Sequence, residues 1–465
     1  PPGVPRRSIP RRRWPQDLPG GAFSREHAAA SSPCIIEGLV DDWPAHADEG
    51  RAWRAGRWER FAAQGGDFMT LHCGFDPADN RMMHFGDDDP SVLYNPGRLK
   101  MPAWAFLEVG QLRRDILRER AKLPAGEPLR LERHPRLRER LNREVEVQNM
   151  PFLSVDLQAP YLHHFAARTV RLRELVPLSF YLSHDTSALP RAMQEDVWPQ
   201  GRKLAPEWGA PHSTRLWATN GAPWQQPYPP WNDAQAPTPS EDQWIYSCFH
   251  CDRMENLHSL LSGEKQVVLV PPGRKDVLKA TRHSRQLQWL VAPVPTPSGG
   301  SYLGATHFES HLQKECTSAQ SAVHPLRTEA ENRRASGGAW PDEVDFPVWV
   351  GSLRPGDTLY IPAYWWHWVA TATPPALGQF DAGALAMSVN FWWWPQHRDE
   401  EMERWCYQNE VENLQNARVP VPQDCHPLPR EAHAEIFRRE TLQMRLQASI
   451  PQPWPRFPEE YEAVD

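Results

Sequence analysis

Short apolar runs that end at turn residues fill the chain between about residues 247 and 395. The run Val267 to Val270 stops at Pro271-Pro272, and Leu359 to Ile361 follows the turn sequence Pro355-Gly356-Asp357. A further run extends from Ala386 to Trp392. Short runs bounded by Gly and Pro are typical of strands. This part of the chain therefore predicts a series of strands.

The chain before this region mixes helical and strand patterns. Between Leu129 and Val147, leucines recur at helical spacing within a dense Arg/Glu stretch, which predicts a solvent-facing helix with ion pairs along it. Residues 23–63 are expected to form a first helix that starts near residue 23, a strand at Ile35-Ile36 and a second helix around Trp53 to Phe61. The other elements expected are a strand from Met69 to Phe75, helices over 102–109 and 111–123, and strand character from Val170 to Leu182.

Two long segments, 191–243 and 297–343, show little periodicity and predict loop insertions. Trp217 and Trp224 in the first segment are expected to cover the core or to line a substrate groove, since clefts are often built from loops. After Trp394, amphipathic stretches over 397–418 and 430–447 predict C-terminal helices.

Composition and charge narrow the classes of function. The chain has 465 residues and a net charge of -7, which gives no basic field for nucleic acid or an anionic membrane. It contains no apolar run of about 18 residues, so we expect no membrane span. Five arginines lie within residues 1–22, which predicts a Pro/Arg-rich flexible tail. A nuclear-import or RNA-contact segment is the alternative for this tail.

The seven cysteines are scattered and odd in number, so they form no disulfide framework. This usage suits a reducing compartment and predicts a cytoplasmic or nuclear protein without a signal peptide. Cys248-x-x-Cys251 could be half of a zinc site, but no second pair stands at the required spacing. We therefore expect both to be buried thiols.

The sequence His250-Cys251-Asp252, with the remote His367, carries the main candidate chemistry. Side chains alternate along a strand, so His250 and Asp252 point to the same side. Two histidines and one carboxylate on one face of a metal leave open positions for substrate. That arrangement suits non-haem Fe(II) oxygenases better than a closed structural site.

The order of the motifs resembles the jumonji C (JmjC) oxygenases, most of all the small hydroxylase-type members and, around residue 181, the JmjC lysyl hydroxylases. The matching pieces span most of residues 31–395. They are residues 32–44, Phe180-Tyr181-Leu182, residues 187–190, His250-Cys251-Asp252, Glu255-Asn256-Leu257, Ser262-Gly263-Glu264-Lys265, Pro271-Pro272, Pro355-Gly356-Asp357, Tyr360-Ile361-Pro362, His367 and Val389-Asn390-Phe391-Trp392.

The resemblance implies a mainly β fold with flanking helices. Its core would be a double-stranded β-helix, the jelly roll of cupin-like proteins, over residues 181–395. Residues 23–180 would elaborate this core as α/β structure, and a helical segment over 396–465 would support a homodimer. The implied activity is that of a dioxygenase that uses Fe(II), 2-oxoglutarate and O2.

The resemblance also implies roles for single residues. His250, Asp252 and His367 would hold iron. The distal carboxylate of 2-oxoglutarate would pair with Lys265, helped by the hydroxyls of Tyr181 and Ser247, while Asn256 and Asn390 would orient the co-substrate. The alternative for Lys265 is an exposed turn lysine, and for Tyr181 a core tyrosine with a satisfied hydroxyl.

The substrate stays open at this stage. A protein or peptide side chain is the expected target of hydroxylation, and demethylation of lysine or arginine and hydroxylation of a tRNA base are alternatives. His258 stands where related chains often carry an aromatic residue, and we expect a packed neutral histidine there. A non-catalytic cupin-like binding protein would keep the barrel alone, and a metal-dependent hydrolase or isomerase would have no need of Lys265.

Overall fold

The structure is a computed structural model that describes most of the chain up to residue 393. The described ranges are 6–46, 68–73, 84–85, 92–95, 97–150, 165–186, 191–224, 235–236, 243–252, 254–272, 280–295, 301–321, 323–328, 330–332, 348–373 and 385–393. The helices expected at Trp53 to Phe61 and beyond residue 396 lie outside them. Among the described residues, no helix is long and apolar enough to cross a bilayer.

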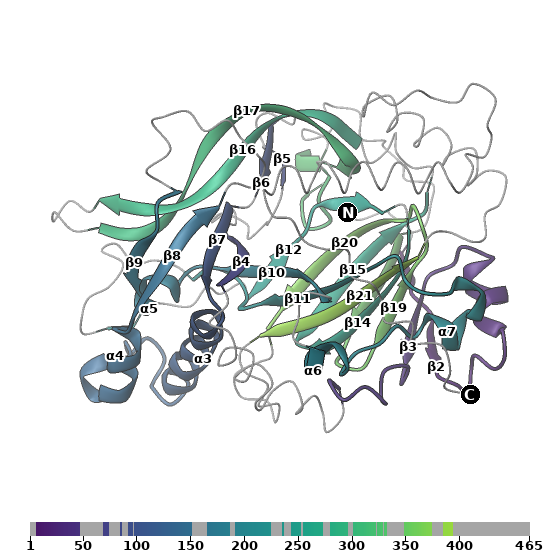
Figure 1. The fold of residues 1–465 in the computed structure, drawn as a ribbon, viewed down its shortest axis with the longest axis horizontal. Coiled ribbons are helices and arrows are strands. Elements are labelled where there is room, and N and C mark those ends of the chain that lie inside the picture. The colour runs from purple at the N-terminus through teal and green to yellow at the C-terminus, as the bar shows by residue number, and fades with distance from the viewer. Residues whose placement is uncertain are drawn as a thin grey trace.

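Two sheets make up most of this structure (Figure 1). Sheet I contains β2 (Arg11–Arg13), β3 (Cys34–Glu37), β4 (Phe68–Cys73), β7 (Gly97–Pro102), β8 (Glu144–Met150), β9 (Arg168–Arg171), β10 (Phe180–Asp185), β11 (Ser213–Thr219), β14 (Glu255–Ser262), β19 (Thr358–Ile361) and β21 (Ala386–Trp393). Sheet II contains β1 (Arg6–Ser8), β5 (His84–Phe85), β6 (Val92–Asn95), β12 (Trp244–Tyr246), β13 (Phe249–Cys251), β15 (Glu264–Val270), β16 (Ala280–Pro295), β17 (Ser301–Ser321), β18 (Val348–Leu353) and β20 (Trp366–Ala372).

Neighbouring strands in each sheet come from distant parts of the chain. Sheet I runs in the order β2-β3-β19-β14-β21-β11-β10-β4-β7-β8-β9, and sheet II in the order β1-β18-β15-β20-β13-β17-β16-β6-β5, with β12 beside β20. Such crossing connections distinguish a jelly roll from a meander. The prediction of a mainly β fold with a jelly-roll core and flanking helices is confirmed.

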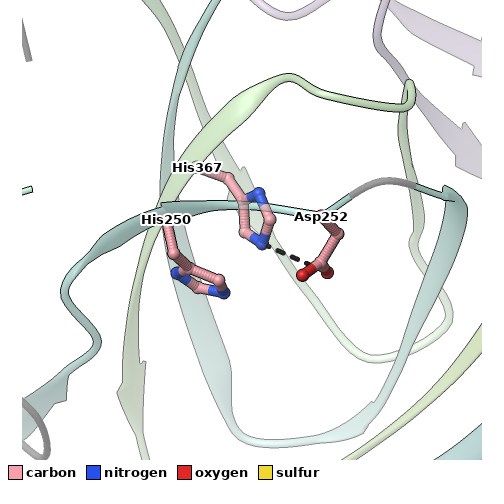
Figure 2. Close-up of side chains that lie close together, drawn as sticks. All are labelled: His250, Asp252 and His367. Atoms are coloured by element: carbon pink, nitrogen blue, oxygen red, sulfur yellow. Dashed lines mark ion pairs between the residues drawn. The ribbon is translucent and has the colours of Figure 1, made fainter. Parts of the chain in front are cut away.

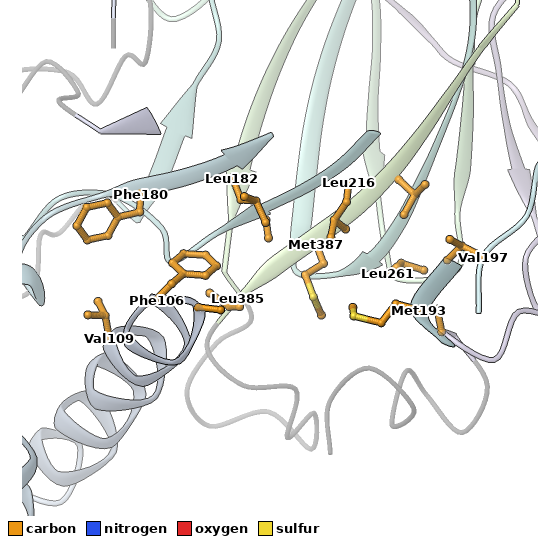
Figure 3. Packing of buried hydrophobic residues seen from close by; sticks show 14 of the residues in the cluster. Phe106, Val109, Phe180, Leu182, Met193, Val197, Leu216, Leu261, Leu385 and Met387 are labelled. Atoms are coloured by element: carbon orange, nitrogen blue, oxygen red, sulfur yellow. The ribbon is translucent and has the colours of Figure 1, made fainter. Parts of the chain in front are cut away.

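Side chains alternate along each strand of sheet I, so its two faces differ. One face packs into the main core, and the other, which turns toward sheet II, carries apolar residues such as Leu260 as well as the polar side chains described below. Leu216 of β11 and Val389 of β21 are paired and buried in the main core. Figure 3 shows this core, in which Phe106 of the helix α3 (Ala103–Arg120) lies near Phe180 of β10. The neighbouring position Asn390 faces the other way, toward sheet II and the candidate site described below.

Some local predictions were wrong in extent. A single helix, α3, replaces the two helices expected over 102–123, since Gly110 is buried within it without interrupting it. The expected long helix at 129–147 is instead the short turn η3 (Leu131–Arg133), α4 (Pro135–Leu141) and then β8. Val145 and Val147 are buried at alternate positions, which is the strand pattern that the charged residues between them concealed.

Further elements lie in regions where the sequence showed little pattern. The expected loop over 191–243 contains α6 (Arg191–Gln194), α7 (Gly201–Leu204), η6 (Pro206–Trp208) and β11. The expected loop over 297–343 contains β17, which pairs with β16. The strand expected over 170–182 is divided into β9, the short helix α5 (Leu172–Leu175) and β10. The helix expected near residue 23 is the five-residue η1 (Ser24–Ala28).

The expected flexible tail is ordered from residue 6 onward and joins both sheets. β1 pairs with β18 of sheet II, and β2 pairs with β3 of sheet I. Between them, Ile9 is buried in an apolar cluster with residues of both sheets. Arg11 donates from Nη2 to both carboxylate oxygens of Asp357 at 2.7 Å. Hydrogen bonds between ionised groups are stronger than neutral ones, so this contact fastens the segment to the turn before β19.

The glycine between β14 and β15 moves the chain from one sheet to the other. A glycine between two short strands is typical of a hairpin turn, but β14 pairs with β19 and β21, whereas β15 pairs with β18 and β20. Gly263 has φ of +91°, a left-handed conformation that favours glycine. A Cβ at this position would lie 2.5 Å from Ala386 Cβ and 2.6 Å from the carbonyl oxygen of Ala372.

Gly263→Ala is therefore expected to lower the melting temperature strongly, because it adds a backbone clash to a strained φ, a combination worth about 2–4 kcal/mol. The matched control is Gly126→Ala, where φ is +81° but nothing lies within 4 Å of the added Cβ. Thermal unfolding followed by circular dichroism compares the two variants. Equal losses of stability in both would contradict the close approach at Gly263.

Candidate metal centre

β13 and β20 are neighbours in sheet II, and their register places His250 directly opposite His367. Asp252 follows the end of β13 by one residue. The potential ligand atoms of these three side chains all lie within 4.8 Å of one another. Figure 2 shows the three side chains converging, with His367 Nε2 3.8 Å from Asp252 Oδ2. His250 and Asp252 thus lie next to His367, which follows Asp252 by 115 residues along the chain.

Backbone carbonyls hold both histidine rings in the same way. His250 Nδ1 lies 2.9 Å from the carbonyl oxygen of Cys248, and His367 Nδ1 lies 3.1 Å from that of Trp365. A carbonyl can only accept, so Nδ1 carries the proton in each ring. The other nitrogen, Nε2, then presents its lone pair. This is the tautomer that a metal-binding histidine needs, fixed by the hydrogen bond at its far side.

The electrostatics of the cluster favour the ligand form of His367. Burial first, and then the neighbouring His250, lower the pKa of His367, while Asp252 opposes the shift. The ring is therefore neutral at pH 7. Trp392 Nε1 donates to Asp252 Oδ2 at 3.2 Å and so restrains the carboxylate. The three side chains could hold a metal ion, and no other such group occurs among the described residues.

Lys265 lies on the same side of sheet II as His367. It is paired with Thr371 of β20, four residues from His367, which places Thr371 about 13 Å along the strand from the metal ligand. Its side chain is almost fully buried, and Nζ donates to Thr371 Oγ1 at 3.1 Å. Within the described part of the chain no carboxylate pairs with it. Burial alone lowers the pKa of Lys265 to about 7.

The hydroxyl of Tyr181 completes this small cluster. It hydrogen-bonds the side chain of Thr371, and burial raises the pKa of Tyr181. Lys265 and Tyr181, which come from different sheets, thus share one threonine. The exposed-turn alternative for Lys265 is wrong, since only 2% of its surface is accessible.

A wall of polar side chains from sheet I faces this region. Asn390 Nδ2 donates to Asn256 Oδ1 at 2.9 Å, while Asn390 Oδ1, the hydroxyl of Ser388 and His258 Nε2 are buried without a hydrogen-bond partner. The register sets His258 opposite Asn390 on β21. Burial, and then the neighbouring Lys265 and His367, lower the pKa of His258 well below its usual value, so that it is a packed neutral histidine.

The hydroxyl of Ser247 has a hydrogen-bond partner in the backbone of β20. Its hydroxyl accepts a hydrogen bond from the Val369 amide at 3.0 Å, and its own amide donates to the carbonyl oxygen of Val369 at 2.9 Å. These bonds fasten the chain before β13 to the strand that carries His367. The nearby thiols of Cys248 and Cys251 are buried and form no disulfide.

Three residues of this region were missed by the sequence analysis. Thr371 and Ser388 face the interior, and Arg215 of β11 lies opposite Asn390 in the register of sheet I. A signal for Thr371 existed: it is four residues from His367, and positions separated by an even number on a strand share a face.

Glu255 was quoted only as part of a motif. It is buried and accepts from the Tyr360 hydroxyl at 2.7 Å and the Ala363 amide at 3.1 Å, so it supports the turn before β20.

Comparison with known protein families agrees with this architecture. The family model described as the cupin-like domain matches residues 20–399. The matched span contains all three residues of the candidate metal centre and most of both sheets. It also covers more than half of the chain. This family includes the JmjC proteins. The chain therefore belongs to the cupin-like domain family.

Proposed function

We propose that this protein is an Fe(II)- and 2-oxoglutarate-dependent dioxygenase of the JmjC type that hydroxylates a side chain of a protein or peptide. Many members of the cupin-like domain family are 2-oxoglutarate oxygenases. The proposal assigns Fe(II) to His250, Asp252 and His367, and 2-oxoglutarate to the space between them and Lys265.

The donor set fits an open catalytic metal site better than a closed structural zinc site. Two neutral imidazoles and one carboxylate are the ligands of non-haem Fe(II) oxygenases, in which the remaining positions accept co-substrate and oxygen. A structural zinc site would call for four protein ligands, often including cysteine. The nearby Cys251 alternates to the face of β13 opposite His250, and the described residues supply no fourth donor.

The observation that carries the proposal is the buried ammonium of Lys265. A charged group removed from water without an anionic partner is strongly unfavourable, and proteins keep such groups where a ligand supplies the counter-charge. The distal carboxylate of 2-oxoglutarate would supply it. Unsatisfied polar atoms on the facing wall, at Asn390 and Ser388, point to a polar occupant of the same space.

This proposal gives separate roles to the residues around the metal centre. Lys265 binds the distal carboxylate, and Thr371 and Tyr181 offer hydroxyl groups beside it. Trp392 holds the orientation of Asp252. Bound iron would supply the oxidation itself, in which one atom of O2 enters a substrate C–H bond as hydroxyl and the other enters succinate as 2-oxoglutarate loses CO2. The sheets on either side exclude water from the reacting groups.

Other functions rank below hydroxylation. Demethylation of lysine or arginine, and hydroxylation of a tRNA base, would use the same centre and remain alternatives for the substrate. A binding protein without activity would have no use for a buried lysine set apart from the metal ligands, and neither would a hydrolase. A homodimer formed through the segment 396–465 stays a proposal, since those residues lie outside the described part.

Affinity for 2-oxoglutarate is expected to fall as pH rises above 7. Burial lowers the pKa of Lys265 to about 7 in the free protein, and a bound carboxylate would raise it, so binding takes up a proton above that pH. Below pH 7 the ammonium is already present and affinity should be flat. Above it the decline approaches about tenfold per pH unit.

Calorimetry between pH 6 and 8.5, in buffers of different ionisation enthalpy, measures both the affinity and the proton uptake. Lys265→Arg provides the comparison, because a guanidinium keeps its proton over this range and should remove the pH dependence. Proton release by the parent on binding, or affinity that rises with pH, would contradict the assignment.

An anaerobic titration tests the proposed function directly. Apo-protein receives Fe(II) and then 2-oxoglutarate, and the visible charge-transfer band of the chelate is recorded. The band should form in the parent, be absent in His250→Ala and require far more 2-oxoglutarate in Lys265→Ala. If metal binds but no band forms at any 2-oxoglutarate concentration, the oxygenase proposal fails and a binding protein or hydrolase takes its place.

A further inference from the structure

The face of sheet I that bears Asn390 continues past the co-substrate region and carries an arginine, Arg215, that the proposed mechanism does not use. Arg215 of β11 is paired with Asn390 of β21 on one side and with Asp185 of β10 on the other. Directly paired residues share a face, so Arg215 points to the same side as Asn390. The next pair on the same face, two positions along, is Ser213 and Trp392, and the Trp392 indole donates to Asp252.

Arg215 lies beside the metal centre and has little to bind there. It is partly buried, and one of its donors, Nη1, reaches the neutral hydroxyl of Ser183 at 3.1 Å. A guanidinium has five N–H donors. Burial lowers the pKa of Arg215, while the charges of Asp185 and Asp252 oppose that shift, so the guanidinium lies within electrostatic reach of a proposed metal ligand.

A second arginine strengthens the positive charge at this place. Arg98 of β7 is partly buried as well, and burial and the charge of Arg215 both lower the pKa of Arg98. Asp252 is assigned to the metal, which leaves Asp185 as the described carboxylate that acts on Arg215. Among the described residues, the nearby Ser183 and Asn390 are neutral and do not neutralise the Arg215 guanidinium, so this position suits an anion better than a cation.

We propose that Arg215 binds a carboxylate of the prime substrate, which is an acidic peptide that presents an Asp or Glu side chain beside the metal centre. This inference rests on the proposed function and names its substrate class. A planar guanidinium matches a carboxylate through two parallel hydrogen bonds. It departs from the cationic substrate that the resemblance to lysyl hydroxylases would imply, because a lysine would be repelled by Arg215 and Arg98.

Binding measurements without turnover test this substrate class. Protein loaded with Mn(II) and 2-oxoglutarate is mixed with three pools of fluorescent nonapeptides, which share neutral degenerate flanks and differ in a central Asp, Asn or Lys. The Asp pool should bind tightest. Arg215→Gln should weaken the Asp pool about 10- to 100-fold and leave the Asn pool unchanged, as expected for loss of a charged hydrogen-bonded pair. Arg215→Glu should shift the preference toward the Lys pool.

Two controls separate this site from other roles of the arginine. Arg136→Gln removes the same charge from an exposed position on α4 and should change no pool. Mn(II) affinity should be retained in Arg215→Gln. If the metal affinity falls and all pools weaken alike, Arg215 acts on Asp252 and the proposal is overturned.

The remaining outcomes are also decisive. An Asp pool that binds no tighter than the others, including the case in which no pool binds, overturns the proposal. So does a single-stranded RNA oligonucleotide that displaces the Asp pool more effectively than unlabelled acidic peptide. Failure of the proposed function shows separately, as absence of the Fe(II)–2-oxoglutarate band, and the pools can then be measured on protein loaded with Mn(II) alone.

Discussion

Lys265→Met is expected to make the protein more stable and, in the same step, unable to bind 2-oxoglutarate. A pKa of about 7, in place of the ordinary lysine value of 10.5, corresponds to about 5 kcal/mol of unfavourable burial of the ammonium. Methionine has a similar shape and carries no charge, and such replacements of buried charges are often stabilising by about 1–4 kcal/mol. The hydroxyl of Thr371 keeps its partner Tyr181.

The pH dependence of this gain has a definite sign. The folded pKa of Lys265 lies below its unfolded value, so the unfavourable contribution is fully present below about pH 7 and is relieved as pH rises toward the unfolded pKa. The stability difference between Lys265→Met and the parent should therefore be largest at pH 6 and shrink by pH 9. Melting temperatures at both pH values, with 2-oxoglutarate binding measured in parallel, check the two halves of the expectation.

Lys203→Met is the matched control for this prediction. Lys203 is exposed and pairs with Asp42 at 2.5 Å, so its replacement should leave both stability and 2-oxoglutarate binding nearly unchanged. A parent-like affinity for 2-oxoglutarate in Lys265→Met would remove the main support for the proposed function. A large loss of stability would show instead that the lysine has a structural partner.

Asp252→Ala should abolish iron binding at stoichiometric concentrations and reduce turnover at least a thousandfold. The substitution removes the only anionic donor of the three, and two neutral imidazoles remain. An enzyme that acts through a bound metal loses most of its rate enhancement with it, and enzymatic enhancements exceed about a millionfold. Fe(II) or Mn(II) titration monitors the affinity, and succinate formation monitors turnover.

The fold should tolerate this change, because the Asp252 side chain is partly exposed and accepts one hydrogen bond from the described residues, from Trp392 Nε1. Asp41→Ala provides the control, since the Asp41 side chain is largely exposed and lies in the turn after β3. Retained metal affinity in Asp252→Ala, with an unchanged melting temperature, would show that the metal binds elsewhere and would falsify the assigned centre.

The strands that carry the centre could be predicted because their pattern is local. His250 and Asp252 are two residues apart, and alternation alone puts them on one side. The pairing of His250 with His367 has no local signature, and only the resemblance to a known family linked them. The structure then supplied the register that sets them opposite one another.

The missed elements had weak local patterns for identifiable reasons. β11 lies among Pro and Trp residues. Its partly exposed positions Ser213, Arg215 and Trp217 nevertheless alternate with the buried positions Thr214, Leu216 and Ala218, a period of two that the loop-like flanks obscured. The sequence around Gly263 reads as a hairpin because a turn and a crossing between sheets use the same residue types. Whether the chain makes a hairpin or crosses between the sheets at this point depends on pairing with β18, β20 and β21, which lie far along the chain.

The N-terminal strands have a consequence for the order of events during synthesis. β1 pairs with β18, so Arg6 can join sheet II only after Val348 has been synthesised. At a translation rate of about 5–20 residues per second, that delay is on the order of tens of seconds. Arg11 likewise meets Asp357 only after 346 further residues. Closure of the two sheets at this edge is therefore a late step of biosynthesis, and the nascent chain must carry an unpaired arginine-rich strand until then.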